Sequence, residues 1–214
     1  MIQTTVSIVE KAMEEVRKGK MVIIQDDESR ENEGDLVVAA EYATGKNINF
    51  MATYGKGLIC TPMLEEKLNS LNLPQMVMDN EESMRTAFTV SVDAKVGITT
   101  GISAFERAHT IQKLIDPAAK PTDFVRPGHV FPLKARQNGV LDRRGQTEAS
   151  VDLMRLAGLK PAAVICEIMK SDGHMARRAE LEAFANEHHL VLLTVQDIVN
   201  YRKEKGLLQF QLNK

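Results

Sequence analysis

The hydrophobic residues of this chain alternate between a helical period and the short apolar runs that are typical of buried strands. Near the start, Ile8, Ala12, Met13 and Val16 lie at helical spacing, and Gly19 follows where a helix would end. The pattern predicts further helices at residues 46–54, 63–71, 104–115, 149–156, 179–188 and 195–205. It predicts strands at residues 21–24, 36–40, 58–61, 86–92, 162–168 and 190–194, and one more directly after His129. This alternation without a long linker predicts one α/β (α+β) domain over residues 1–214, with a disordered tail at 207–214.

A segment rich in carboxylates lies between the first two predicted strands. It contains one arginine, Arg30, and the acidic residues Asp26, Asp27, Glu28, Glu31, Glu33 and Asp35. Like charges that lie close together disfavour each other's ionisation, so such a cluster indicates a bound cation or a role in proton transfer. The spacing does not fit an EF-hand, because Glu31 stands where the glycine is required and Val37 where the last acidic ligand is required. The alternatives are a site for a hard cation such as Mg²⁺ and a solvated acidic hairpin.

Composition narrows the function classes without naming one. The 214 residues carry a net charge of −2, with 5% aromatic residues and no tryptophan, which argues against binding to nucleic acid. The two cysteines, Cys60 and Cys166, are far apart and fit no metal or redox spacing, which indicates a reducing compartment. No apolar run approaches the roughly 20 residues of a membrane span, and residues 1–20 lack the features of a signal peptide. We therefore expect a cytoplasmic protein with no membrane contact and no nucleic-acid partner.

Candidate functional residues in the middle of the chain are a histidine and a helix start. His129 directly follows a Pro-Gly turn that fixes the backbone, and an imidazole is the usual proton shuttle near neutral pH. An ordinary surface role for His129 is the alternative. At the helix predicted for residues 104–115, Ser103 and Glu106 form a capping box. Residues 99–101 just before it could bind an anion through backbone N–H groups, although this signal alone is weak.

The second half of the chain contains two more candidates. Arg143, Arg144 and Thr147 precede a predicted helix and could hold a phosphate group. The alternative is a charged loop in which Thr147 caps that helix. Glu167 interrupts the apolar run at residues 163–168, so it is either a face-alternating strand residue or a buried carboxylate with a raised pKa. Together these residue types indicate an enzyme that binds a metal ion and a phosphate, with several carboxylates and one histidine.

Several segments, taken in order, resemble one enzyme family. That family is 3,4-dihydroxy-2-butanone 4-phosphate synthase of riboflavin biosynthesis. The segments of this chain that resemble it are DDESRENEGD, TAFTVSVD, GITTGIS, RPGHVFPL, TEASVDLMRLAG and ICEI. The resemblance implies a lyase that converts D-ribulose 5-phosphate to 3,4-dihydroxy-2-butanone 4-phosphate and formate through metal-stabilised enediolates. It also implies a homodimer that uses Mg²⁺ or Mn²⁺, each chain forming a single domain with a mixed sheet flanked by helices.

The resemblance also implies roles for individual residues. Arg30, Glu31 and Asp35 match the family's substrate contacts, and Glu31 also matches a metal ligand. His129 and Glu167 match its essential histidine and glutamate, so proton transfer is expected from Glu31, Asp35, His129 and Glu167 as a group. The residues expected to bind the substrate are Arg30, Glu31, Asp35, Thr100, Arg143, Thr147 and Glu167. The positions expected to support them are Asp26, Glu28, Glu33, Cys60 and Glu148.

The chain departs from the family pattern at a position that matters for the metal. The family's second loop reads R-x-G-H-T-E, whereas here Gln146 replaces the histidine that is the other metal ligand. A glutamine carbonyl oxygen can coordinate Mg²⁺, but it is neutral and cannot transfer protons. A second departure, Glu106 in place of an aspartate, still fits a helix cap.

Three hypotheses follow from this comparison. The first is an active synthase that tolerates Gln146, and the second is a diverged paralogue that binds a pentulose phosphate but is slow or inactive. The third is a purely structural acidic-loop protein, which leaves His129 and Glu167 without a role.

Overall fold

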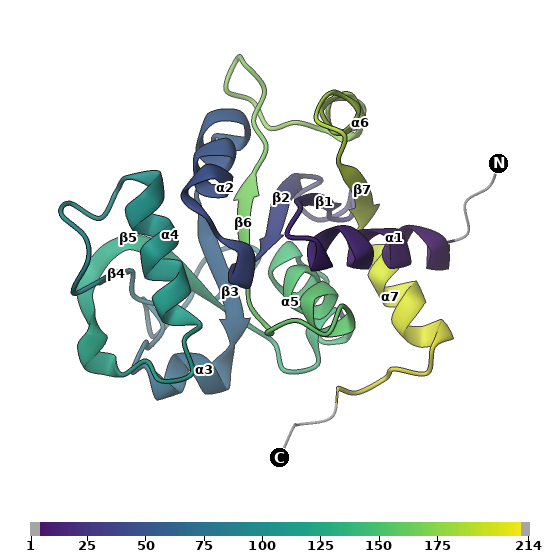
Figure 1. Ribbon diagram of the computed structural model, residues 1–214. Coiled ribbons are helices and arrows are strands. Elements are labelled where there is room, and N and C mark those ends of the chain that lie inside the picture. Colours follow the sequence, from purple (N-terminus) through teal and green to yellow (C-terminus); the bar gives the residue numbers. More distant parts are fainter. Residues whose placement is uncertain (1–4, 211–214) are drawn as a thin grey trace.

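A single mixed β-sheet is the centre of the fold. The structure is a computed structural model that describes residues 5–210. The strands in this part of the chain are β1 (Val22–Gln25), β2 (Gly34–Ala39), β3 (Cys60–Leu64), β4 (Val92–Ala94), β5 (Phe124–Ala135), β6 (Ala163–Glu167) and β7 (Val191–Thr194). They lie in the order β4-β5-β3-β6-β2-β1-β7 (Figure 1). β1 is parallel to β7 and β3 is parallel to β5, whereas the other neighbouring pairs are antiparallel. The mixed sheet expected from the sequence is confirmed.

Helices cover both faces of this sheet. The α-helices are α1 (Thr5–Arg17), α2 (Gly45–Phe50), α3 (Glu65–Ser70), α4 (Ala104–Leu114), α5 (Gln146–Leu156), α6 (Arg178–Glu187) and α7 (Val195–Glu204). Shorter helical segments are η1 (Ala40–Tyr42), η2 (Met51–Gly55), η3 (Pro121–Asp123) and η4 (Gly139–Leu141). α1, α5 and α7 pack together on one face, while α2, α4 and α6 lie over the other. The result is a three-layer arrangement of helices, sheet and helices.

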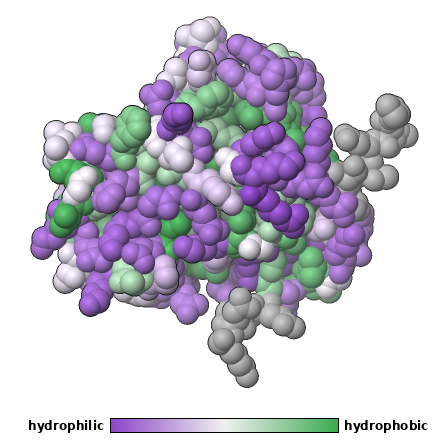
Figure 2. All heavy atoms as spheres, in the orientation of Figure 1, coloured by the Kyte–Doolittle hydropathy of each residue, from purple (hydrophilic) through white to green (hydrophobic). Residues whose placement is uncertain are grey.

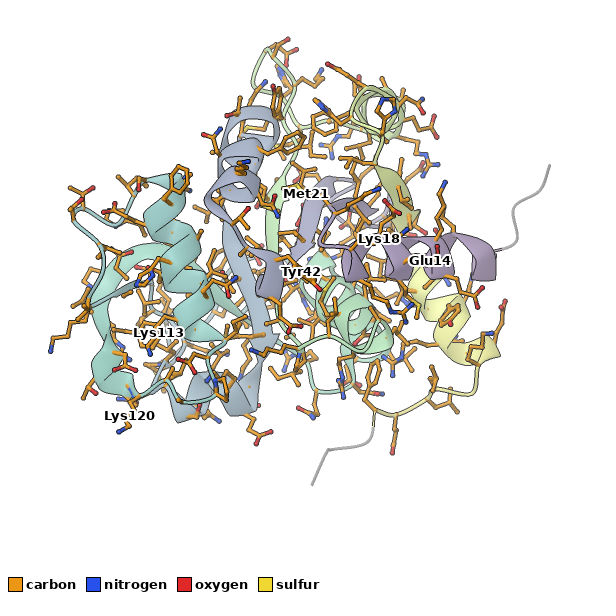
Figure 3. The ribbon with its side chains drawn as sticks, in the orientation of Figure 1. Glu14, Lys18, Met21, Tyr42, Lys113 and Lys120 are labelled. Carbon is orange, nitrogen blue, oxygen red and sulfur yellow. The ribbon has the colours of Figure 1, made fainter. Side chains whose placement is uncertain are left out.

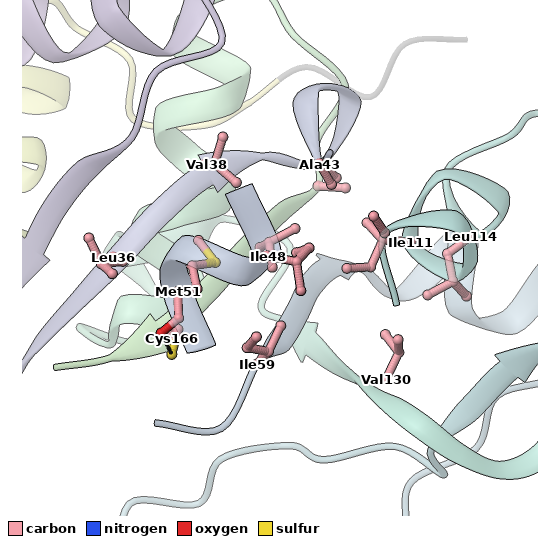
Figure 4. Packing of buried hydrophobic residues seen from close by; sticks show 14 of the residues in the cluster. Leu36, Val38, Ala43, Ile48, Met51, Ile59, Ile111, Leu114, Val130 and Cys166 are labelled. Carbon is pink, nitrogen blue, oxygen red and sulfur yellow. Dashed lines mark hydrogen bonds between the residues drawn. The ribbon is translucent and has the colours of Figure 1, made fainter. Parts of the chain in front are cut away.

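Alternating side chains of the central strands enter two separate cores. In β1, Ile23 packs in the core under α2 and α4, whereas Val22 and Ile24 pack in the core under α1, α5 and α7. Figure 4 shows the first of these cores, in which Leu36 and Val38 of β2 belong to the same cluster as Ile48 of α2. Since both faces of the sheet are buried, the strands read in sequence as continuous apolar runs instead of alternating ones.

The helices outside the sheet are amphipathic, as their sequence period predicts. Glu14 of α1 is exposed, and so is Lys18 directly after the helix (Figure 3), whereas Val9, Ala12 and Val16 of the same helix are buried. The face seen in Figure 2 is accordingly hydrophilic over α1. In the region that the structure describes, no helix is both long and apolar enough to cross a membrane.

Two predicted strands differ from the observed ones. The strand expected to stop at Pro62 continues to Leu64, because its parallel pairing with β5 extends through Pro62 to Leu64. In the strand predicted at residues 86–92, Phe88 and Thr89 form only isolated bridges, and β4 begins at the last residue, Val92. There the N–H of Thr89 donates to Pro132 O at 3.1 Å, so the segment lies against β5 without forming a regular ladder.

The histidine predicted to follow a turn lies inside a strand. β5 is twelve residues long and includes both the Pro-Gly pair and His129, and its Arg126–Pro127 peptide bond is cis. The backbone of Gly128 lies so close to Val92 and Asp93 of β4 that a Cβ atom would collide with their main chain. The glycine therefore serves a close approach of two strands, not a turn.

The helix after the second polar loop begins earlier than predicted. α5 starts at Gln146 instead of Ala149, with Gly145 at its N-cap. Thr147 is consequently not the cap but a residue of the first turn, and its side chain is buried. Glu148 also lies in this turn, where the partial positive charge of the helix N-terminus favours a carboxylate.

Candidate functional site

A polar cavity of about 250 Å³ lies where the acidic loop meets the ends of β2, β6 and α5. Its walls come from segments that are far apart in the sequence. The lining residues are Arg30, Glu31, Asp35, Cys60, Glu82, Thr86, Phe88, Leu133, Gln146, Thr147, Ile165 and Glu167. Seven of these were predicted from the sequence as site or supporting residues: Arg30, Glu31, Asp35, Cys60, Gln146, Thr147 and Glu167.

Asp26 is a buried residue that forms hydrogen bonds with other residues of the acidic loop. It is only 3% exposed, and its Oδ2 accepts hydrogen bonds from the Arg30 guanidinium at 2.7 Å and from the Glu31 N–H at 3.1 Å. Its Oδ1 accepts from the Glu33 N–H at 2.9 Å. Asp26 therefore fixes the backbone that presents Glu31, which is a supporting role. By contrast, Glu28 is exposed and does not line the cavity.

Arg30 links the loop to the start of α5. Its Nη1 also donates to Glu31 Oε2 at 3.0 Å and to Gln146 Oε1 at 2.6 Å. The other end of the Gln146 amide, Nε2, donates to Glu33 O at 3.4 Å. Gln146 is thus placed at the cavity as predicted, but its carbonyl oxygen accepts a hydrogen bond from a guanidinium.

Asp35 and Glu167 line the cavity from opposite positions on two neighbouring strands. They are direct partners in the antiparallel register of β2 and β6, where cross-strand side chains lie close together. Burial raises the pKa of Asp35 well above its usual value, and the neighbouring carboxylates of Glu167 and Glu31 raise it further. Burial also raises the pKa of Glu167, against the opposing effect of the Leu58 N–H, which donates to Glu167 Oε2 at 2.8 Å.

Arg143 lies behind the cavity wall. Its Nη1 donates to Glu148 Oε2 at 2.6 Å, and its Nη2 donates to Met84 O and to Thr86 Oγ1, both at 3.0 Å. Burial raises the pKa of Glu148, which is 1% exposed, although the charge of Arg143 opposes this shift. The pair holds Thr86 and the first turn of α5 against each other, so Arg143 supports the wall that Thr147 lines.

His129 and Thr100 do not reach this cavity within one chain. His129 precedes Leu133 of the cavity wall by four residues on β5, roughly 13 Å along an extended strand. Its Nδ1 lies 2.6 Å from Asp93 Oδ2, and its N–H donates to Asp93 Oδ1 at 2.9 Å. Thr100 is exposed on the neighbouring loop, where Gly101 lies against both Asp93 and His129.

The N–H groups proposed for an anion at residues 99–101 already have an acceptor. The Glu106 carboxylate accepts from the Gly101 N–H at 3.1 Å and from both the N–H and the hydroxyl of Thr99. Ser103 caps α4 as predicted, its hydroxyl accepting from the Glu106 N–H at 3.2 Å. The capping interpretation of this segment is therefore the correct one.

Sequence reasoning missed two groups of residues. Asp93, the partner of His129, is the one carboxylate in the segment TAFTVSVD, and its position in a β-prone run resembles that of Glu167. Glu82, Thr86 and Phe88 line the cavity from an irregular segment, where no periodicity could have assigned them to a face.

The donor atoms at the cavity suit a hard cation held with few protein ligands. Among residues 5–210, no cluster of three or more His, Cys, Asp or Glu side chains could enclose a metal ion. Glu31 lines the cavity, and its Oε1 accepts no hydrogen bond from the described residues, whereas Oε2 accepts from Arg30. One available carboxylate oxygen beside open space matches Mg²⁺, which commonly keeps several ligand positions for water or substrate oxygens.

Fold and cavity together define an α/β protein whose acidic pocket, bordered by a helix N-terminus, is built for a small polar molecule. The model of the family described as 3,4-dihydroxy-2-butanone 4-phosphate synthase matches residues 10–201. The chain therefore belongs to the 3,4-dihydroxy-2-butanone 4-phosphate synthase family.

Individual relatives agree with this assignment. "Riboflavin biosynthesis protein RibBA" of Aquifex aeolicus is 58% identical over 202 residues, which cover 94% of this chain and 50% of that protein. Among solved structures, RibBX of A. baumannii, a two-domain synthase, is 55% identical with a TM-score of 0.88, covering 91% of this chain and 57% of that one. A synthase solved in complex with two magnesium ions is 44% identical with a TM-score of 0.87, covering 92% and 98%. The chain spans about half the length of the curated relatives it matches.

The buried position of Asp35 predicts a change in how stability depends on pH. Burial raises its pKa in the folded protein, so its contribution to the free energy of unfolding is greatest below the unfolded value of about 3.9 and is lost as the pH rises through the folded value. Asp35→Asn cannot ionise, so this variant should lose less stability than the unmodified protein between about pH 4 and about pH 8.

The measurement is the thermal midpoint at both pH values, without divalent cations. Asp27→Asn is the matched control, because Asp27 is exposed and hydrogen bonds from Ser29 lower its pKa. The pH dependence of the control is opposite, because the small contribution of Asp27 to the free energy of unfolding is present at high pH and lost on acidification. Parallel curves for the unmodified protein and Asp35→Asn would contradict the prediction.

Proposed function

We propose that this chain converts D-ribulose 5-phosphate to 3,4-dihydroxy-2-butanone 4-phosphate and formate, as a lyase of riboflavin biosynthesis (EC 4.1.99.12). The observation that supports this most is the meeting of Glu31, Asp35 and Glu167 around one cavity in a chain of the synthase family. Removal of a proton from a ketose, loss of a hydroxyl and release of formate need acids and bases at different substrate atoms.

The raised pKa values of two carboxyls suit this chemistry. An ordinary carboxylic acid is too acidic to hold a proton near neutral pH, but burial brings Asp35 and Glu167 closer to the working range of an acid–base catalyst. Asp35 can then donate a proton to a departing hydroxyl while Glu31 or Glu167 accepts one from carbon. We assign proton transfer to Glu31, Asp35 and Glu167 as a group, with His129 as the fourth member.

The residues present also fit a divalent cation, Mg²⁺ or Mn²⁺. Glu31 would hold it through Oε1, which accepts no hydrogen bond from residues 5–210, and Gln146 would join only if its carbonyl oxygen turned away from Arg30. When bound, such an ion polarises substrate oxygens and makes the neighbouring carbon more acidic. A relative of this family has been solved with two magnesium ions, which supports the choice of metal.

The start of α5 is the proposed position of the substrate phosphate. Thr147 lines the cavity in the first turn of this eleven-residue helix, where backbone N–H groups and the helix dipole favour an anion. Arg143 lies directly behind this turn and adds positive charge, although its guanidinium donates to Glu148 and Thr86. The phosphate would serve as a handle that positions the reacting carbons among the carboxylates.

We further propose that the protein is a homodimer in which His129 completes the site of the partner. His129 and Thr100 do not line the cavity of their own chain. Large apolar side chains are exposed on the segments around them, namely Val96, Ile102, Phe105 and Val125. Exposed apolar side chains of this kind support a protein interface here.

The sequence also predicted that residues 1–214 form one domain with a disordered tail at 207–214. Residues 207–210 are described, and the Phe210 ring lies 3.6 Å from the Arg155 guanidinium carbon and 4.1 Å from that of Arg202. Residues 211–214 lie outside the described part of the chain. We propose that this chain forms a single synthase domain. Its cytoplasmic location stays a prediction.

Formate release tests the proposed reaction directly. Purified protein supplied with D-ribulose 5-phosphate and Mg²⁺ should produce formate, and a chelator should stop the reaction because one carboxylate alone cannot replace the ion. Glu167→Gln should lower turnover by about 100-fold or more. Glu182→Gln, an exposed residue of α6 paired with Arg178, is the control and should leave turnover unchanged. Binding of the sugar phosphate without formate would favour the paralogue hypothesis instead.

Gln146 is the observation that favours a slow or inactive paralogue. We expect Gln146→His to leave turnover unchanged or to raise it, and to lower the Mg²⁺ concentration needed, because an imidazole is a stronger metal ligand than a neutral amide. Gln196→His is the matched control, since the Gln196 side chain lies outside the cavity and forms hydrogen bonds with Arg144 and Asn200. A large loss of activity in Gln146→His would show that the Arg30–Gln146–Glu33 link is required as it stands.

Mixed dimers test whether two chains share the site. His129→Ala and Glu167→Gln should each be inactive alone, yet a statistical mixture should recover about a quarter of normal activity, since half of the dimers then have one intact site of two. Activity that stays at the level of the separate variants would mean that His129 does not act on a partner's cavity. A mass measurement in solution provides the accompanying check of the dimer.

A further inference from the structure

The carboxylate of Glu167 is held by the backbone of a segment that carries no functional side chain. η2 ends at Gly55, and Lys56 then takes a left-handed conformation with φ +71°. This reversal places the following peptide groups along the end of β6. The Met169 N–H donates to Gly55 O at 2.9 Å, and the Gly57 N–H donates to Glu167 O at 3.2 Å. The main chain of Glu167 is therefore tied to this segment.

The side chain of Glu167 is tied to the same segment. The Leu58 N–H donates to Glu167 Oε2 at 2.8 Å, one residue after the N–H that bonds the Glu167 carbonyl. A hydrogen bond from a backbone amide to a carboxylate is charge-assisted, and the donor is fixed in direction by the peptide plane. Two consecutive amides thus determine both the backbone position and the carboxylate orientation of one residue.

Gly57 leaves the space that this arrangement needs. A Cβ atom at this position would lie 2.7 Å from both the main-chain N and the main-chain O of Glu167, and it would collide with Oε2. The backbone of residue 57 is not in the left-handed region, so the requirement for glycine here is steric and not conformational. Any larger residue must push the Glu167 carboxylate away from the Leu58 amide.

We propose that the Gly57–Leu58 backbone positions Glu167 for proton transfer, with Gly57 acting as a positioning residue. The inference deepens the proposed synthase activity and rests on it. A catalytic group that is displaced by about 1 Å can lose on the order of 100-fold in rate. Proton transfer therefore requires that the Glu167 carboxylate point in one direction, which the packing of the sheet does not fix.

Gly57→Ala tests this role. It should lower kcat by about 10-fold to 100-fold while KM changes by less than about threefold, because the substrate handle at α5 is untouched. Loss of the Leu58 hydrogen bond removes an effect that lowers the pKa of Glu167, so the acidic limb of the kcat profile should move to higher pH. Leu58→Ala is the matched control, since it keeps the N–H group and removes only a 42% exposed side chain.

Two further variants separate a positioning role from a general loss of structure. Leu58→Pro deletes the donor and leaves Gly57 in place, so it should reproduce the kcat loss that Leu58→Ala lacks. In a Glu167→Asp background the carboxylate is already withdrawn from the Leu58 amide. Adding Gly57→Ala to this variant should therefore lower kcat by less than about threefold. Equal losses in Leu58→Ala and Leu58→Pro, or full additivity with Glu167→Asp, would overturn the inference.

The outcome remains distinguishable from a failure of the proposed function. If the unmodified protein releases no formate, the function is wrong, and the positioning role is then tested by NMR titration of Glu167. A higher Glu167 pKa in Gly57→Ala than in Leu58→Ala supports the role. Identical titration curves in the two variants overturn it.

Discussion

The antiparallel register of β2 and β6 is the constraint on which the site depends. It places Asp35 directly opposite Glu167, at the end of two strands whose other pairs are apolar. Two carboxylates in such surroundings cannot both remain ionised without compensation, so the protein must supply protons, a cation or hydrogen-bond donors. The Leu58 amide supplies part of this compensation to Glu167, and the raised pKa values of both carboxyls reflect the remainder. A shift of one residue in this register would turn one of the carboxylates to the opposite face of the sheet.

Much of the fold could be predicted from local pattern, because most elements bury one complete face. α1, β1, α4 and α6 lie close to the predicted ranges, and the Ser103 cap of α4 is confirmed. The failures have physical reasons that a single sequence does not contain. Residues 86–92 have strong β propensity, yet their neighbour on β5 offers only isolated pairing. The strand containing His129 reads as a turn because a glycine needed for close packing resembles one needed for a bend.

The site was predictable in its residue types and less so in its geometry. A carboxylate within an apolar run, such as the half-buried Glu167, was visible from the sequence because burial of a carboxylate requires a reason. The different roles of the carboxylates in the acidic loop could not be predicted from the sequence. Asp26 and Glu31 look alike in sequence, yet one faces backbone N–H groups inside the loop and the other faces the cavity. The contact of Gln146 with Arg30 joins residues more than a hundred positions apart, which no local pattern can reveal.

The charges around the cavity differ between its two sides. Carboxylates gather at the end of β2 and β6, whereas the start of α5 presents Thr147 and backbone N–H groups, with Arg143 behind them. An anionic group is repelled from the first region and attracted to the second, so a molecule with one anionic end is favoured in one orientation. A neutral residue, Gln146, lies between the two regions. There Gln146 accepts from Arg30 and donates to Glu33 O, and so it connects the acidic loop to the helix without adding charge to either.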